Sequence, residues 1–237
     1  MSAPLILIGI IFAAAFPLIA VYFLFRLAKY KYPLSRYLIT VLVGSAAFLP
    51  ALLLQNILAI PVYYGRVALF YHYFIRIALT EELSRLLMLF IFFWFYKRFK
   101  SLSDSNYAID GKQPPALEVI KIGTAAGLVS GLGFAMFENA VYAASNINLL
   151  LLRLVTAALH AACGSRIGAA AVTFRSNPVK AAARVLSAVA IHGIYNLMVT
   201  LPGISSIVAV LIALSAFTIA MISITGNSQS AEAPTDY

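Results

Sequence analysis

Charged residues are scarce in this sequence. They make up 11% of its 237 residues, whereas hydrophobic residues make up 62%. A soluble domain carries roughly 25% charged residues, so this balance excludes an ordinary soluble domain. It predicts an integral membrane protein whose helices cross the bilayer and leave almost no room for a soluble part.

Cysteine and acidic residues are also few. The one cysteine, Cys163, excludes an intramolecular disulfide, and its apolar surroundings favour a small buried hydrophobe. Eight acidic residues stand against 17 lysines and arginines, which gives a net charge of +9. The basic residues gather in short connections between apolar runs rather than on one face. We therefore expect them to orient the chain in a membrane, and we expect no nucleic-acid partner.

Long apolar runs follow one another along the chain, and a transmembrane helix needs about 20 such residues. The sequence predicts an all-α, polytopic bundle of about seven (seven or eight) transmembrane helices over residues 1–225, followed by a disordered cytoplasmic tail over 226–237. The third run is too long for one upright span, so it is either steeply tilted or begins with an interfacial or re-entrant piece around Tyr71 to Ile77. The runs are Pro4 to Phe25, Tyr37 to Ile60, one within Val67 to Tyr96, Leu117 to Ala143, Asn148 to Val172, Ala181 to Leu201 and Ile204 to Thr225.

The basic residues assign the two sides of the membrane. They follow the first, third and fifth runs, so these connections are predicted to be cytoplasmic by the positive-inside rule. The opposite connections contain Arg66 as their one basic residue. We therefore predict a multi-pass protein of the cell membrane with its N-terminus outside and its C-terminus in the cytoplasm. The polar loop Arg98 to Pro115 is predicted to be a flexible cytoplasmic connection.

A few ionisable and polar groups interrupt the apolar runs. A charged group at the centre of a span costs about 2.5 to 3.5 kcal/mol, so such groups usually mark a functional site. Helix geometry places these groups at one depth, roughly 8 to 18 Å below the outer boundary, so they can share one pocket. They are Glu81, Glu82 and Arg85 in the third run, Glu138 in the fourth, His160 in the fifth, and His192 and Asn196 in the sixth.

The strings around these groups resemble, in order and in membrane placement, the motifs of the PrsW family of intramembrane proteases. That family is similar to the CAAX-protease and bacteriocin-processing superfamily. The resemblance implies supporting roles for Arg85, Phe134 and Asn139, and it has two departures: Arg85 stands where lysine is frequent, and Asn196 where aspartate is frequent. The strings are Glu81-Glu82-Leu-Ser-Arg85, Gly133-Phe134-Ala-Met-Phe137-Glu138-Asn139-Ala-Val-Tyr142, Arg153 with His160, and His192-Gly193-Ile-Tyr195-Asn196.

These groups could hydrolyse a peptide bond in two ways. In the first, which we favour, no metal takes part: Glu81 or Glu82 activates a water molecule, and either His192 and Asn196 donate to the oxyanion or His192 protonates the leaving amine. In the second, Glu138, His160 and His192 hold one zinc ion with an open position for water. The cofactor is accordingly either none or one zinc ion.

The resemblance implies an endopeptidase that cuts a single-span membrane protein, such as an anti-sigma factor, near its extracytoplasmic boundary. A proton-coupled transporter would use the same groups as a proton relay, but such proteins usually contain an internal repeat, and the sequence shows none. A non-enzymatic membrane partner with a protease-like fold is the third alternative. The retained polar residues of every motif argue against it. The sequence leaves the oligomeric state open.

Three glycines in the fourth run have a structural interpretation. Gly123, Gly127 and Gly131 form a GxxxGxxxG stripe on one helix face. Small residues at this spacing let two membrane helices approach closely. We therefore predict that this stripe packs against a neighbouring helix.

The assignment of sides can be tested by labelling. In a chain whose Cys163 is replaced by alanine, single cysteines are placed in the Ala144 to Ile147 connection or in the Arg98 to Pro115 loop. We expect a membrane-impermeant maleimide to label the first in intact cells and the second only after lysis. The opposite pattern would invert the topology.

Overall fold

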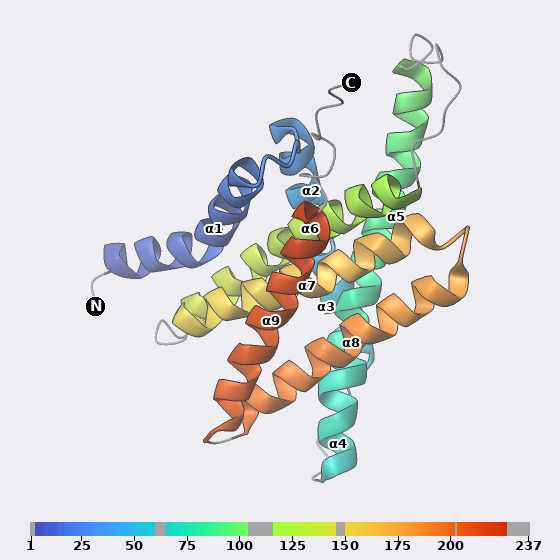
Figure 1. Cartoon of the computed structure of the whole chain (residues 1–237). Coiled ribbons are helices and arrows are strands. Elements are labelled where there is room, and N and C mark those ends of the chain that lie inside the picture. Colours follow the sequence, from blue (N-terminus) through green and yellow to red (C-terminus); the bar gives the residue numbers. More distant parts are fainter. Residues whose placement is uncertain (1–2, 60–64, 104–115, 146–149, 202, 227–237) are drawn as a thin grey trace.

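The protein is helical throughout the part of the chain that the structure describes, with no strand there. The structure is a computed structural model, and it describes residues 3–59, 65–103, 116–145, 150–201 and 203–226 (Figure 1). The predicted tail lies outside these residues except for Gly226. The helices are α1 (Ala3–Leu27), α2 (Leu34–Ala46), α3 (Phe48–Ile57), α4 (Arg66–Phe70), η1 (Tyr71–Leu79), α5 (Thr80–Ser103), α6 (Ala116–Ser145), α7 (Leu150–Thr173), α8 (Pro178–Thr200) and α9 (Ser205–Thr225).

The all-α fold class is thus confirmed for the described residues. Five segments there are long and apolar enough to cross a membrane, so the protein is multi-pass. They are Leu34–Ile57, Leu117–Tyr142, Leu152–Thr173, Pro178–Thr200 and Ser205–Thr225. The first predicted span is not among these five. Within the described residues it counts only as a shorter apolar helix, Ala14–Leu27. The total of seven or eight and the sides of the termini remain predictions.

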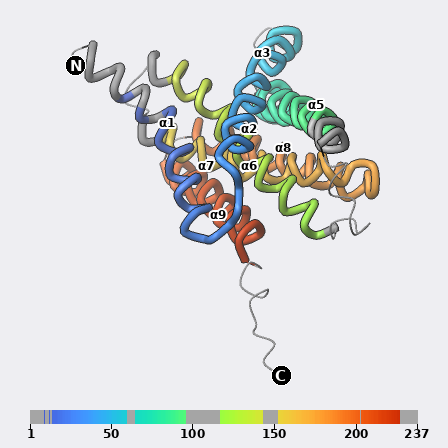
Figure 2. Tube along the Cα trace, turned by 90° about the horizontal axis from the view of Figure 1, so that it is seen from above, coloured from blue at the N-terminus to red at the C-terminus, as the bar shows by residue number. Residues whose placement is uncertain are grey.

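The second predicted span is broken into two helices rather than continuous. The break lies at Ala47, between α2 and α3. Pro50, in the first turn of α3, has no N–H to donate to the carbonyl of Ala46, so one hydrogen bond of a continuous helix is missing there. As a result α3 can take its own course, and it lies beside α5 and away from α1 (Figure 2).

The long third run is helical from α4 through η1 into α5, with no break around Tyr71 to Ile77. Its middle part, η1, is a π-helix of 9 residues. A π-helix has a wider turn than an α-helix and is frequent at functional sites. Here it ends at Leu79, two residues before Glu81. Residues 98–103, predicted as loop, instead form the end of α5; a helix need not stop at the membrane boundary.

The predicted glycine stripe is confirmed as a packing surface between α6 and α7, which run side by side (Figure 1). A Cβ added at Gly127 would lie 2.0 Å from the carbonyl oxygen of Gly164, and one at Gly131 would lie 2.0 Å from that of His160. No side chain larger than hydrogen fits at these distances. The backbones are therefore close enough for Glu138, two turns beyond Gly131 on α6, to reach His160 on α7.

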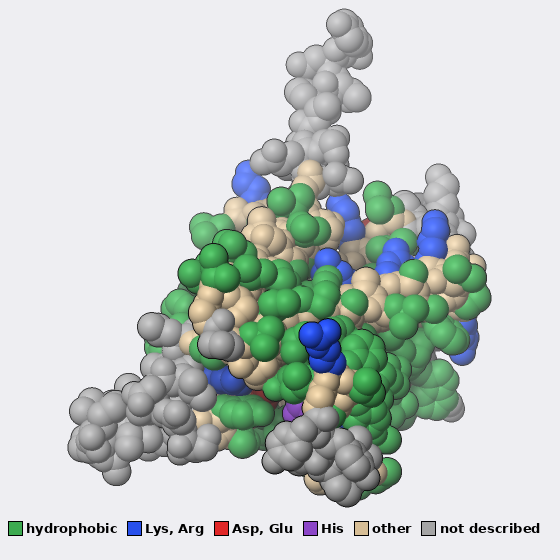
Figure 3. All heavy atoms as spheres, turned by 90° about the horizontal axis from the view of Figure 1, so that it is seen from below, with side chains coloured by type: hydrophobic (Ala, Val, Ile, Leu, Met, Phe, Trp, Pro, Cys, Tyr) green, Lys and Arg blue, Asp and Glu red, His purple; other side chains and the backbone are tan. Residues whose placement is uncertain are grey.

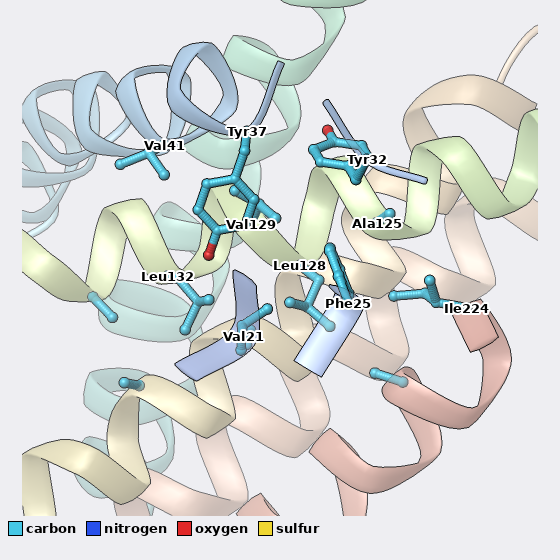
Figure 4. Close-up of a cluster of buried hydrophobic side chains, with 14 residues drawn as sticks. Val21, Phe25, Tyr32, Tyr37, Val41, Ala125, Leu128, Val129, Leu132 and Ile224 are labelled. Carbon is cyan, nitrogen blue, oxygen red and sulfur yellow. The ribbon is translucent and has the colours of Figure 1, made fainter. Parts of the chain in front are cut away.

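Apolar side chains fill the space around α6 and cover much of the outer surface. Val21 and Phe25 of α1, Val41 of α2, Leu128 of α6 and Ile224 of α9 belong to one buried cluster (Figure 4). Outside, hydrophobic side chains are widely exposed, and they predominate on the face drawn in Figure 3. A soluble protein could not expose so large an apolar area, whereas lipid accommodates it.

A larger residue in the contact between α6 and α7 should destabilise the protein. We expect Gly127→Ala to lower the free energy of unfolding by about 1 to 3 kcal/mol, the usual cost of overpacking. The measurement is thermal unfolding of the purified protein in detergent. Ala182→Val, which also adds carbon to a small residue but on the exposed face of α8, should leave the unfolding temperature unchanged. Equal stability of the two variants would contradict the close packing.

Candidate active site

The ionisable groups singled out in the sequence lie together inside the helix bundle. Glu81, Glu82 and Arg85 come from the first turns of α5, His160 from α7 and His192 from α8. All five are buried, and none is more than 4% exposed. The predicted proximity of these groups is thus observed, and Glu138 of α6 joins them through a hydrogen bond to His160.

Glu82 is fixed by two partners. Its Oε1 accepts a hydrogen bond from Arg85 Nη2 and lies 2.8 Å from His192 Nδ1. Arg85 is fully buried, and its Nη1 also donates to the carbonyl oxygen of His160 at 3.1 Å. The contact to Arg85 neutralises Glu82, and the contact to His192 orients the ring so that Nε2 faces the middle of the site.

Glu138 contacts His160 in the same way that Glu82 contacts His192. Its Oε2 lies 2.6 Å from His160 Nε2, and its Oε1 lies 3.7 Å from Arg153 Nη1. The Glu138 side chain is 15% exposed, more than the other two carboxylates of the site. Glu138 therefore orients His160 so that Nδ1 faces the middle of the site. Of the three carboxylates, Glu138 lies nearest the surface.

Glu81 lies between the two histidines. Its Oε2 is 3.7 Å from His192 Nε2 and 4.0 Å from His160 Nδ1. Two of these atoms, Glu81 Oε2 and His160 Nδ1, are buried without a hydrogen-bond partner among the described residues. Buried polar atoms normally have a hydrogen-bond partner. Atoms that lack one and converge on one point therefore indicate a binding site for an ion or a small molecule.

This set fits a divalent metal. One ligand atom from each of Glu81, His160 and His192 lies within 4.8 Å of the other two. Two imidazoles and one carboxylate are a usual ligand set of catalytic zinc. Metal-ligating histidines also typically give their other ring nitrogen to a carboxylate, as both rings do here. The set includes Glu81 where the sequence suggested Glu138, because Glu138 takes the far nitrogen of His160.

Two of the three supporting residues, Arg85 and Phe134, lie against groups of this centre. The Arg85 guanidinium lies 4.9 Å over the ring of Phe134, whose centroid is 5.3 Å from that of His160. Phe134 thus packs against both groups and keeps lipid and bulk water away. Asn139 is buried and donates to the carbonyl oxygen of Arg153 at 3.0 Å, so it joins α6 to α7.

The Asn196 side chain is not joined to the polar centre by a hydrogen bond or ion pair with a described residue. It lies one turn after His192 and is half-buried, and its side chain forms no hydrogen bond to another described residue. Its expected role as an oxyanion donor remains a prediction.

One residue that contacts the centre was not singled out in the sequence. Gln55 of α3 donates from Nε2 to Glu81 Oε1 at 3.0 Å. In the sequence, Gln55 and Asn56 form a polar pair near the end of an apolar run. Such a pair also occurs where an ordinary span ends, so it did not indicate a site. Gln55 reaches Glu81 because α3 packs beside α5.

The structure thus describes a multi-pass helical protein whose buried centre contains two carboxylate-bound histidines with a third carboxylate between them. The family model described as PrsW family intramembrane metalloprotease matches residues 32–223, which is most of the chain. The chain belongs to this family, and the resemblance noted in its motifs is confirmed. Comparison with curated proteins and with solved structures gave no match.

The buried Arg85–Glu82 pair should be important for stability. Arg85→Met removes the cation and leaves Glu82 uncompensated, which should cost about 3 to 5 kcal/mol. The double variant Arg85→Met with Glu82→Gln removes both charges and should recover part of that loss. Thermal unfolding in detergent measures both. If Arg85→Met alone is as stable as the parent protein, the pairing of Arg85 with Glu82 is contradicted.

Proposed function

We propose that this protein hydrolyses a peptide bond of a membrane protein at the buried centre, with Glu81, His160 and His192 as ligands of one zinc ion. The observation that carries the proposal is the convergence of Glu81 Oε2, His160 Nδ1 and His192 Nε2, two of them unpartnered, on one buried point. Membership of a metalloprotease family supports it.

The surrounding residues have separate roles in this proposal. Glu82 and Glu138 each bind the far nitrogen of a histidine, which fixes the tautomer and the direction of the ring. Arg85 neutralises Glu82, so a carboxylate can be kept in the apolar interior. Glu82 therefore stays in place during turnover rather than exchanging protons.

A zinc ion held there would supply Lewis-acid polarisation of the scissile carbonyl and of the attacking water. The chain itself must accept and return a proton. We assign this to Glu138 Oε1, because Glu138 is the most exposed carboxylate of the three and its other oxygen is bound to His160. Phe134, packed against His160, limits access of bulk water.

The substrate that we propose is a single-span membrane protein, such as an anti-sigma factor, cut near its extracytoplasmic boundary. Two arguments support this class. The family resemblance implies it, and the predicted topology places the site residues closer to the outer than to the inner boundary. The protein would act in the cell membrane as a multi-pass enzyme.

Metal analysis separates the two mechanisms. We expect purified active protein to contain about one zinc ion, and a strong chelator to abolish cleavage until zinc is returned. Glu81→Gln and His192→Ala should lose the metal, whereas the exposed Glu118→Gln should keep it. Full cleavage by metal-free protein would favour the glutamate mechanism instead.

Cleavage of a co-expressed single-span substrate tests the enzymatic function. We expect Glu81→Gln and Glu138→Gln to reduce cleavage by about 10² to 10⁴ fold, because each loses a group that acts in the transition state. Glu118→Gln is the matched carboxylate-to-amide control, and immunoblotting checks that every variant accumulates. If Glu81→Gln, Glu82→Gln and Glu138→Gln all cleave at the parent rate, the protein is not a protease of this kind, and the proton-relay alternative gains support.

A further inference from the structure

Glu81 is held on the side away from the histidines by a helix that contributes no other side chain to the polar centre. Gln55 Nε2 donates to Glu81 Oε1 at 3.0 Å, while Glu81 Oε2 faces His160 and His192. Gln55 lies on α3, next to α5 (Figure 2). The two oxygens of one carboxylate thus have different environments, one hydrogen-bonded and one directed to the centre.

We propose that Gln55 is a positioning residue: its amide fixes the Glu81 carboxylate so that Oε2 alone is presented to the centre. This rests on the proposed function, in which Glu81 is a ligand. A neutral donor suits the task, because it satisfies one oxygen without cancelling the charge that a cation requires. A lysine or arginine at this position would instead compete with the metal for Glu81.

The contacts of α3 separate this role from a merely structural one. Two hydrogen bonds hold the end of α3 against η1: Arg76 Nε donates to the carbonyl oxygen of Gln55 at 3.0 Å, and Tyr71 Oη donates to that of Leu58, the residue after α3, at 3.1 Å. Both use backbone carbonyls as acceptors. They persist whatever side chain occupies position 55, so the Gln55 amide is not needed to dock the helix.

The ring of Phe48 adds a third anchor, with its centroid 5.6 Å from that of Phe134. The start of α3 is therefore packed on α6, and its end is bonded to η1. Gln55 lies toward the bonded end, where α3 passes Glu81. A change confined to its side chain should alter the carboxylate and leave the helix in place.

The test compares Gln55→Met, which keeps an unbranched side chain of similar length but has no donor, with Asn56→Ala on the exposed neighbour. Zinc affinity is measured by competition with a chromogenic chelator, and kcat and KM are measured with a single-span substrate. We expect Gln55→Met to weaken zinc binding by about 10 to 100 fold, as for other residues that orient a ligand, and to lower kcat with KM unchanged. Asn56→Ala should match the parent protein in zinc affinity, kcat and KM.

A double-mutant cycle shows whether the effect passes through Glu81. In a Glu81→Asp background the carboxylate is one methylene shorter and withdrawn from Gln55, so adding Gln55→Met should cause little further loss of zinc affinity. If Gln55→Met is too unstable to purify, Gln55→Leu replaces it: the side chain stays of similar size, the donor is lost, and the same loss of zinc affinity is expected.

The outcomes distinguish this inference from the proposed function. Parent-like zinc affinity and kcat in the Gln55 variant, with both lost in Glu81→Gln, would overturn the positioning role and leave the zinc site standing. A loss of zinc affinity that is equally large in the Glu81→Asp background would also overturn it. If Glu81→Gln itself binds zinc and cleaves like the parent, the proposed function fails first.

Discussion

The structure depends on one constraint: a charge inside a membrane must have a partner, because lipid offers none. Glu82 is compensated by Arg85, and Glu138 lies against His160 and Arg153. Arg85 lies one turn after Glu82 on α5 and also donates to the carbonyl oxygen of His160 on α7, while Glu138 of α6 meets two residues of α7. The pairing of charges therefore specifies how α5, α6 and α7 stand relative to one another, and a different arrangement would leave a carboxylate in apolar surroundings.

Close backbone packing makes this pairing reachable. Gly131 faces the carbonyl oxygen of His160, and Glu138 lies two turns further along α6. A residue with a side chain at Gly131 would push α7 outward and lengthen the contact between Glu138 and His160, which is now 2.6 Å. The same His160 carbonyl accepts from Arg85, so the α6–α7 interface and the α5 cluster share one backbone group. Packing and chemistry are thus coupled through His160.

Much of the fold was predictable because membrane insertion is controlled by composition. Apolar runs indicated the helices, and polar residues within them indicated the site, since both follow from the cost of polar groups in lipid. The break at Ala47 and the π-helix before Glu81 were not predicted, because each depends on backbone bonds rather than on hydropathy. The Gln55 contact depends on the packing of α3 beside α5 and was missed as well. Asn196 looked equivalent to His192 by helical spacing, but spacing alone does not supply a hydrogen-bond partner.

The adjacent glutamates show how one helix turn produces two different groups. Neighbouring residues project about 100° apart, so Glu81 and Glu82 had to face different surroundings, although the sequence could not say which was which. Arg85 binds Glu82, three residues earlier, and lies 4.0 Å from Glu81. Glu82 is therefore neutralised by a fixed cation, whereas Glu81 has a neutral donor on one oxygen and two histidines facing the other. A carboxylate so placed keeps its charge available for a bound cation. The requirement to bury charge and the requirement to use it are thus met by two consecutive residues.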